Sequence, residues 1–271
     1  MCLFKRRKKI GLALGSGGPR GLTHIGVIKT LVENDIPIDY IAGCSVGALV
    51  GGMYAKFQDI YKVESYFKHL TYPDLVKVFS DPRFAHGVLK GEKALKFLRS
   101  WVGKTRIENL PIPFKAIATD LKSGETVIID KGELALAIRT SASIPVFFKP
   151  VKRGRQFLVD GGNSMPVPAE IVKEMGADIV IAVDLDYCYI SNKNQPKNIE
   201  KASMTHIAER ALDILSYTLA KENTQNADIV ITPDVYDVGW QRFVKGGDII
   251  AEGEKATEKM LGEIKRKLKR N

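Results

Sequence analysis

Short apolar runs alternate with longer amphipathic stretches along most of the chain. The short runs are typical of strands buried in a parallel sheet, and they predict strands at residues 10–14, 40–43, 114–119, 126–130, 151–152, 156–159, 179–183 and 229–232. The longer stretches repeat apolar residues at helical spacing, and they predict helices at residues 21–32, 46–57, 92–101, 134–140, 168–175, 203–221 and 247–269. Because the two kinds of element alternate, we expect one α/β domain with a mostly parallel sheet and helices on both faces.

Two segments depart from this pattern. Residues 59–109 are richer in aromatic and charged side chains and less periodic, so they are a candidate insertion or cap over one edge of the core. The polar segment SNKNQPKN at residues 191–198 predicts a disordered loop. Because no internal repeat or linker divides the chain, we expect a basic tail at residues 1–9 and a single domain at residues 10–271.

Positive charge is concentrated at the two ends of the chain. Lys and Arg number 41 against 31 Asp and Glu, which gives a net charge of +10, and KRRKK at residues 5–9 and KRKLKR at residues 265–270 carry much of the excess. Such ends contact anionic lipid or nucleic acid without sequence specificity, or they are simply solvated. No nucleic-acid motif is visible, and aromatic residues are not interleaved with the basic ones. We therefore expect no nucleic-acid partner, and an anionic membrane is the better candidate for a peripheral contact.

Nothing in the sequence indicates export. No stretch approaches the roughly 18 consecutive apolar residues of a membrane span. The basic start and the run IGLALG resemble a signal peptide, but the run ends in GSGGPRG without a small-residue cleavage site. Cys2, Cys44 and Cys188 are too few and too scattered for a disulfide framework or a zinc site. We expect a cytoplasmic protein, peripheral at the inner face of the membrane if it binds lipid, with no metal and no cofactor.

A candidate nucleophile lies in Gly43-Cys44-Ser45-Val46-Gly47, which matches the pattern G-x-S-x-G. The run YIAG before the serine predicts a strand and VGALVGGMYA after it predicts a helix, which is the strand–turn–helix context of a nucleophile elbow. The partial positive charge at the start of a helix favours a developing alkoxide. Ser45 is therefore the candidate nucleophile, although a glycine-rich turn with an incidental serine would give the same string.

A serine hydroxyl needs a base that accepts its proton. None of the four histidines has the setting of a triad histidine. His24 lies inside the first predicted helix, and His69 and His86 lie in the irregular middle segment. Only His206 follows the candidate aspartates in the Ser–Asp–His chain order of the α/β-hydrolases, and it sits early in a predicted helix.

Asp160 is the candidate base. It follows the predicted strand QFLV, and Gly161 and Gly162 after it allow close approach of the backbone. Functional carboxylates in parallel α/β sheets lie at such strand ends, although Asp-Gly is also a common turn dipeptide. Asp184 and Asp186 end another predicted strand and are rival carboxylates without the glycines. An aspartate in water, with a pKa of about 3.9, is a weak base, but burial raises this pKa and makes direct proton transfer from a serine feasible.

Three elements stand in order along the chain: GSGGPRG at residues 15–21, GCSVG at residues 43–47 and DGG at residues 160–162. Together with TSASIPVFFKP at residues 140–150, they resemble the motifs of the patatin-like phospholipases, especially the small bacterial members. The likeness covers about residues 9–183. The resemblance implies a three-layer α/β/α sandwich and a serine lipid acyl hydrolase that cleaves acyl esters of phospholipids or related lipids through a Ser–Asp dyad.

The same resemblance implies roles for single residues. Ser45 would be the nucleophile and Asp160 the base, and an acyl-enzyme on Ser45 would be hydrolysed by water. The backbone N–H groups of Gly17 and Gly18 would form the oxyanion hole. Arg20 would support this loop or the helix that follows it.

A second hypothesis for the glycine loop is a dinucleotide-binding module. This function needs G-x-G-x-x-G and an acidic residue about 20 positions further on, at the end of a second strand. The string GSGGPR at residues 15–20 has Arg20 at the sixth position, where it would crowd the contact between helix and strand. Glu33 and Asp35 end a predicted helix, and Asp39 precedes the second strand. The acidic partner is therefore misplaced.

A third hypothesis is a lipid-binding or regulatory protein that has the fold without the activity. The intact Ser45 and Asp160 argue against it. For a lipid or acyl-ester substrate, Pro145, Phe147 and Phe148 are candidate lining residues of an acyl channel, with an ordinary buried loop as the alternative.

Overall fold

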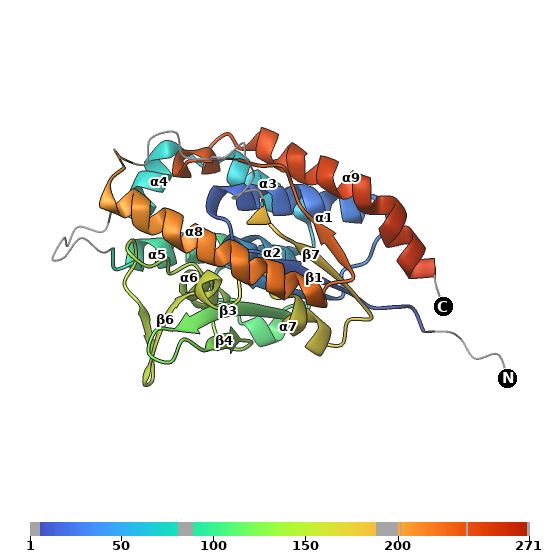
Figure 1. Ribbon diagram of the computed structural model, residues 1–271, viewed down its shortest axis with the longest axis horizontal. Helices are drawn as coiled ribbons and strands as arrows, with labels where there is room; N and C mark the ends of the chain where they lie inside the picture. The colour runs from blue at the N-terminus through green and yellow to red at the C-terminus, as the bar shows by residue number, and fades with distance from the viewer. Residues whose placement is uncertain (1–5, 81–88, 188–199, 201, 237, 270–271) are drawn as a thin grey trace.

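A single mixed sheet organises the molecule, and helices cover both of its faces (Figure 1). The computed structural model describes residues 6–80, 89–187, 200, 202–236 and 238–269. The sheet has eight strands within these residues: β1 (Ile10–Leu14), β2 (Tyr40–Cys44), β3 (Phe114–Asp120), β4 (Thr126–Ile129), β5 (Val151–Arg153), β6 (Gln156–Asp160), β7 (Ile179–Val183) and β8 (Ile229–Ile231). Each predicted strand is confirmed, with bounds that differ by no more than one residue at either end.

Most predicted helices are confirmed as well. The described α-helices are α1 (Thr23–Glu33), α2 (Val46–Phe57), α3 (Ile60–Lys68), α4 (Tyr72–Phe79), α5 (Glu92–Val102), α6 (Leu134–Ser141), α7 (Ala169–Glu174), α8 (Met204–Asn223) and α9 (Gly247–Lys269). Short 3-10 helices are η1 (Gly18–Leu22), η2 (Ile107–Asn109), η3 (Gly161–Asn163), η7 (Thr224–Asn226) and η8 (Trp240–Phe243). The first predicted helix begins two residues later than expected, because η1 occupies its place.

The helices α3 and α4 were not predicted, although both begin with a capping residue. The Asp59 side chain accepts a hydrogen bond from the Lys62 N–H at the start of α3. Thr71 and Asp74 form a reciprocal capping box at the start of α4. Such caps satisfy backbone N–H groups that have no partner inside the helix. They were one available sequence signal, and the helical spacing of Ile60, Val63 and Phe67, which are buried in α3, was another.

The order of the strands is β5-β6-β3-β2-β1-β7-β8, and β4 pairs with β3 outside this path. Strands β3, β2, β1, β7 and β8 pair with their neighbours in parallel. Strands β4, β5 and β6 join the sheet by antiparallel pairing. The register aligns Leu14 at the end of β1 with Gly43 of β2 and Val183 of β7. The loops that follow these three strands therefore emerge at the same edge of the sheet.

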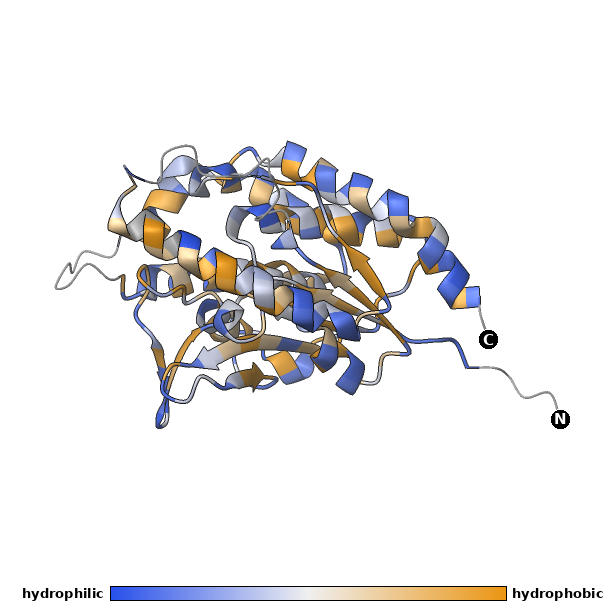
Figure 2. Cartoon of the chain, in the orientation of Figure 1, coloured by the Kyte–Doolittle hydropathy of each residue, from blue (hydrophilic) through white to orange (hydrophobic). Residues whose placement is uncertain are grey.

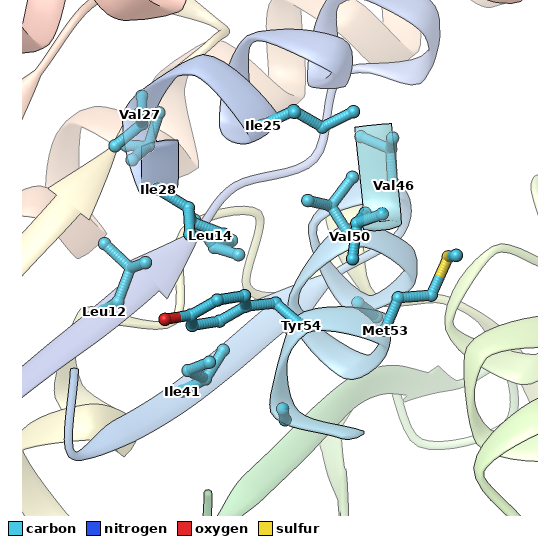
Figure 3. Packing of buried hydrophobic residues seen from close by; sticks show 14 of the residues in the cluster. Leu12, Leu14, Ile25, Val27, Ile28, Ile41, Val46, Val50, Met53 and Tyr54 are labelled. Atoms are coloured by element: carbon cyan, nitrogen blue, oxygen red, sulfur yellow. The ribbon is translucent and has the colours of Figure 1, made fainter. Parts of the chain in front are cut away.

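Side chains of alternating strand residues point to opposite faces of the sheet. One face packs against α1, α2 and α9, and Figure 3 shows part of this core, with Leu12, Leu14, Ile25, Ile28, Ile41, Val50 and Met53 close together. The other face presents small strand residues, among them Ala13, Ala42 and Ala182, to α7 and to Ala220 of α8. The result is the three-layer α/β/α sandwich expected from the sequence.

Residues 59–109 contain α3, α4, α5 and η2. An aromatic cluster joins α3 to α5, with Trp101 5.3 Å from Phe67 and 5.4 Å from Tyr66 between ring centroids. Helix α3 also contacts α2, and α5 contacts α6, so the segment packs on the helical layer of the sandwich. Its role as an insertion or cap stays a prediction.

The predicted basic tail is partly held by the folded domain. Arg7 forms two hydrogen bonds with the carboxylate of Asp39, and Arg6 pairs with Asp178. Exposed ion pairs of this kind contribute about 0–1 kcal/mol each, so they fix the start of β1 only weakly. Residues 1–5 and the predicted disordered loop at 191–198 lie outside the described residues.

Two further properties concern only the residues with described positions. No helix there is both long and apolar enough to cross a bilayer. No group of three or more His, Cys, Asp or Glu side chains there is arranged to hold a metal ion. Cys44 is buried and carries a free thiol, whereas Cys2 and Cys188 lie outside these residues.

The two valines of α1 give a matched test of this packing. Val27 is fully buried in the core, whereas 37% of Val32 is exposed. We expect Val27→Ala to lower the free energy of unfolding by about 2 kcal/mol, because it removes two buried methyl groups and leaves a cavity. Val32→Ala should change this free energy by less than about 0.5 kcal/mol. Urea unfolding followed by circular dichroism measures both, and equal effects would contradict the packing described for α1.

Candidate active site

Ser45 lies at the junction between β2 and α2, and its backbone is strained. It precedes the first residue of α2 and has a φ of 53° and a ψ of −118°, a region that residues with a side chain rarely adopt. Its N–H donates a hydrogen bond of 2.9 Å to Ser141 Oγ at the end of α6. Only 4% of Ser45 is exposed. The strained turn therefore holds the hydroxyl at the start of α2 in a largely enclosed position.

Gly47 explains why this turn can be so tight. A Cβ atom at Gly47 would lie 2.2 Å from the carbonyl oxygen of Leu14, the last residue of β1. Any side chain there would push α2 away from β1 and from the glycine loop that follows it. The second glycine of the G-x-S-x-G pattern thus brings the start of α2 against the end of β1.

Asp160 meets Ser45 because of the unusual placement of β6. Strand β2 pairs with the first part of β3, up to Cys44 opposite Ile117. Strand β6 pairs with the next part of β3 and runs in the opposite direction, so that Asp160 lies opposite Ala118. Because β4 occupies the other edge of β3 at this point, β2 and β6 lie end to end along one edge.

The Ser45 Oγ donates a hydrogen bond of 2.7 Å to Asp160 Oδ2. The other carboxylate oxygen, Oδ1, accepts the N–H of Gly162 at 2.8 Å. The Asp160 backbone is also held, since its carbonyl oxygen accepts from Thr119 Oγ1 and from Asn163 Nδ2. The structure thus brings together the two residues that the sequence singled out as nucleophile and base.

Burial raises the pKa of Asp160 from its ordinary value of 3.8 to about 6. The hydrogen bonds from Gly162 and Ser45 act in the opposite direction, because they favour the ionised carboxylate. The negative charge of Asp186 adds to the effect of burial. At neutral pH the carboxylate is still ionised, but it binds a proton more readily than an aspartate in water.

No histidine bonds to Ser45 or Asp160 among the side chains that the structure describes. His24 is buried, and its Nε2 lies 2.9 Å from the carbonyl oxygen of Gly15. His69 bonds within α3 to the Ser65 carbonyl oxygen. Residue 86 and the side chain of residue 206 lie outside the described parts.

The glycine loop between β1 and α1 supplies two backbone donors. Gly17 has a φ of 145° and Gly18 a φ of 53°, which a residue with a side chain adopts only with strain. The preceding N–H groups of Gly15 and Ser16 are used, donating to Val183 and Pro166 carbonyl oxygens. Within the described part of the chain, the N–H groups of Gly17 and Gly18 donate no hydrogen bond.

The side chain of Arg20 is buried and bonds both within this loop and to the segment after β7. Its Nε donates to the Gly17 carbonyl oxygen at 3.2 Å, and its Nη1 donates to the Leu185 carbonyl oxygen. Its Nη2 lies 3.2 Å from Asp186 Oδ1 in a buried ion pair. Asp184, the other rival carboxylate, accepts backbone N–H groups from Asp186 and Tyr187.

Neither rival carboxylate is therefore bonded to the candidate nucleophile. Burial and the charge of Asp186 raise the pKa of Asp184 to about 6. Sequence reasoning missed Ser141 and Ser216, which support Ser45 and Asp186 respectively. Ser141 lies in the segment TSASIPVFFKP at residues 140–150, but a single sequence does not show which group either serine contacts.

The predicted acyl-lining residues belong to an aromatic cluster beside the glycine loop. Ring centroids lie 5.9 Å apart for Phe148 and Phe79, and 6.0 Å apart for Phe147 and Trp240. The indole of Trp240 lies 3.8 Å from the position of a Cβ on Gly18. The cluster thus places apolar rings next to the candidate oxyanion site. Pro145 is partly buried in the same loop.

A separate surface cavity lies away from this site. It is an open hollow beside α3, α4 and α5, with Tyr66, His69, Phe97 and Trp101 among its lining residues. Neither Ser45 nor Asp160 lines it.

Comparison with known sequences finds one family and many relatives. The profile described as "Patatin-like phospholipase" matches residues 12–173. The uncharacterized NTE family protein Rv1063c of Mycobacterium tuberculosis (strain ATCC 25618 / H37Rv) is 41% identical over 178 residues, which are 66% of this chain and 49% of that protein. The patatin-like phospholipase domain-containing protein ZK370.4 of Caenorhabditis elegans is 34% identical over 65% of this chain and 13% of its own length. The chain thus spans about half of the first relative and a small part of the second.

The fold has a solved counterpart in VipD from Legionella pneumophila. The two share 15% sequence identity with a TM-score of 0.60, and the likeness covers 96% of this chain and 67% of VipD. At this identity the likeness concerns the fold alone. The matched profile, the relatives and the three glycine motifs at the edge of the sheet agree on one conclusion: the chain belongs to the patatin-like phospholipase family.

Proposed function

We propose that this chain is a serine lipid acyl hydrolase, which cleaves acyl esters of phospholipids or related lipids with Ser45 as nucleophile and Asp160 as base. The observation that carries the proposal is the 2.7 Å hydrogen bond from the Ser45 hydroxyl to a buried carboxylate. A nucleophile and its base must lie within such reach for direct proton transfer. Membership of the patatin-like phospholipase family gives independent support.

In the proposed reaction, Asp160 accepts the Ser45 proton while Oγ attacks the carbonyl carbon of the ester. The tetrahedral intermediate collapses, the bond to the alcohol oxygen breaks, and the alcohol leaves with the proton from Asp160. Water then attacks the acyl-enzyme while Asp160 again acts as base, which releases the fatty acid and restores Ser45. The raised pKa of Asp160 assists both steps, because it lies closer to the high pKa values of the hydroxyl groups of Ser45, the alcohol and water, which exchange protons with the carboxylate.

The oxyanion that forms on the substrate carbonyl needs donors that are already in place. The N–H groups of Gly17 and Gly18 are suited to this role, since neither is used within the described residues. A single such donor contributes about 3–4 kcal/mol to the stability of a transition state. The starts of η1 and α2 add partial positive charge in the same region.

A lipid substrate also needs apolar surface beside the reacting ester. We assign Phe147, Phe148 and Pro145 to the acyl chain, as expected from the sequence. The contact of Trp240 with Phe147 and its proximity to Gly18 support this assignment. Burial of each methylene group of an acyl chain against such rings would contribute about 0.8 kcal/mol.

Helix α8 is a proposed contact with a membrane, in addition to the basic ends at residues 5–9 and 265–270, which would attract anionic lipid. Its outward face is apolar at helical spacing and exposed, with Met204, Ile207, Ala211, Ile214 and Leu215 along it (Figure 2). The helix also contacts η3, which directly follows Asp160. Helix α8 thus lies next to the segment that follows Asp160. The cytoplasmic location expected from the sequence stays a prediction.

Removal of either member of the pair tests the chemistry. We expect Ser45→Ala to abolish labelling by a fluorophosphonate probe and to lower hydrolysis of a p-nitrophenyl ester by about 10³-fold or more. Asp160→Asn should lower hydrolysis by about 10²–10⁴-fold, because it removes the general base. The exposed residues Ser123 and Asp130 provide matched controls as Ser123→Ala and Asp130→Asn, which should retain wild-type activity.

Equal labelling of the wild type and Ser45→Ala would contradict the proposal and favour a lipid-binding protein without this activity. Retained hydrolysis in Asp160→Asn, together with loss in His206→Ala, would instead favour a triad with histidine as base.

The dependence of the rate on pH tests the environment of Asp160. Only the ionised carboxylate can accept the serine proton, so kcat/KM should rise with pH and reach a plateau above the pKa of Asp160. With this pKa raised to about 6, we expect kcat/KM to fall about tenfold for each pH unit well below 6. A pH–rate profile in buffers of constant ionic strength measures this midpoint. A midpoint close to the ordinary value of 3.8 would contradict the buried position of the carboxylate.

Vesicle binding tests the apolar face of α8. We expect the double substitution Ile214→Ser/Leu215→Ser to lower binding to vesicles that contain anionic lipid by about tenfold, because two exposed apolar side chains no longer enter the interface. Val32→Ser is the matched control, since Val32 is also exposed but belongs to α1 on the other layer. Co-sedimentation with vesicles gives the bound fraction. Equal loss in both variants, or none in either, would contradict the assignment of α8.

A further inference from the structure

We infer that Asp186 is a positioning residue for the proposed reaction, which fixes the glycine loop through Ser16 and Arg20. The inference rests on the proposed function, because the exact position of the loop matters only if Gly17 and Gly18 bind an oxyanion. In this role Asp186 would touch neither the substrate nor the reacting atoms.

Both oxygens of the Asp186 carboxylate are used by three side chains, two from the glycine loop and one from α8. Oδ1 pairs with Arg20 Nη2 at 3.2 Å. Oδ2 accepts from Ser16 Oγ at 3.2 Å and from Ser216 Oγ of α8 at 2.7 Å. Only 2% of Asp186 is exposed. The carboxylate therefore joins the glycine loop, the end of β7 and α8 at one buried point.

The two partners in the glycine loop stand on either side of the proposed donors. Ser16 directly precedes Gly17, and Arg20 follows Gly18 after one intervening residue. Arg20 also donates through Nε to the carbonyl oxygen of Gly17. The single carboxylate of Asp186 thus restrains the donor segment from both ends.

The backbone at Gly17 and Gly18 must be held by other parts of the chain, because these two residues do little to restrict their own conformation. Gly17 and Gly18 have no side chains and populate more backbone conformations than other residues, so fixing them costs more conformational entropy. An oxyanion hole is effective only when its donors are held in place before the charge forms. A displacement of about 1 Å can reduce a rate about 10²-fold. A buried ion pair suits this task, because moving either partner would leave a charge buried without compensation.

Three variants separate the contributions. Asp186→Asn keeps the shape and can still accept from serine hydroxyls, but it loses the charge pair with Arg20. Ser216→Ala removes one hydrogen bond to the carboxylate and is less disruptive to folding. Thr218→Ala is the matched control on the same helix, because Thr218 is exposed and its hydroxyl bonds within α8.

The first measurement is steady-state hydrolysis of the p-nitrophenyl ester. We expect Asp186→Asn to lower kcat by about 10- to 100-fold, with KM changed less than about twofold, since the loop acts on the transition state. Ser216→Ala should lower kcat by a smaller factor, and Thr218→Ala should leave it unchanged. In a double-mutant cycle with Arg20→Gln, the combined loss should not exceed the larger single loss, because the two residues act as a pair.

The second measurement is hydrogen–deuterium exchange of the peptide that covers residues 15–22, which requires no catalytic activity. We expect faster exchange there in Asp186→Asn and Ser216→Ala, and unchanged exchange in Thr218→Ala. Wild-type exchange of this peptide in both variants would overturn the inference, as would additive losses of kcat in the cycle.

Different results would contradict the proposed hydrolase function and the positioning role of Asp186. If the wild type shows no Ser45 chemistry, the proposed function is wrong, and the exchange data still decide whether Asp186 fixes the loop. If the wild type is labelled at Ser45 and Asp186→Asn retains wild-type kcat, the proposed function stands and the positioning role is wrong. If Asp186→Asn does not fold, Ser216→Ala gives the deciding comparison.

Discussion

The end-to-end meeting of β2 and β6 along one edge of β3 is the constraint on which the candidate site depends. In a sheet of parallel strands alone, carboxyl ends lie side by side and their loops fan out above the sheet. Here an antiparallel strand runs toward β2 and ends at the same level, so Asp160 meets Ser45 directly. A shift of one residue in the pairing of β6 with β3 would turn the carboxylate to the other face. The antiparallel part of the sheet is therefore as important to the site as the parallel core.

Much of this arrangement could be predicted from the sequence, because its signals are local. The G-x-S-x-G turn needs glycine where α2 approaches β1, and the apolar runs give every strand to within one residue. The sequence could not show that β6 runs antiparallel to β3, because this pairing joins residues far apart along the chain. The expectation that Asp160 lies at the end of a strand was confirmed, but the pairing of this strand with β3 was not predicted.

Long-range polar contacts were equally invisible in the sequence. Asp186 looked like a rival base, since a carboxylate after a strand is the only signal a single sequence offers. Its actual partners, Ser16, Arg20 and Ser216, are 30 to 170 residues away along the chain. Helices α3 and α4 were missed although Ile60, Val63 and Phe67 of α3 are buried at helical spacing. Capping residues marked their starts, but caps alone are weak evidence.

The raised pKa of Asp160 has a consequence for the energetics of the whole fold. The carboxylate gives up its proton near pH 6 in the folded chain and near its ordinary value of 3.8 when unfolded. Between these values the unfolded state binds fewer protons, so this residue makes the protein less stable as pH rises and contributes a constant penalty above about pH 6. The penalty is on the order of 3 kcal/mol. Ionisation of Asp160, which the proposed chemistry requires, thus lowers the free energy of unfolding. Packing in the rest of the sandwich must offset this cost and the cost of the glycine-rich turns around the site.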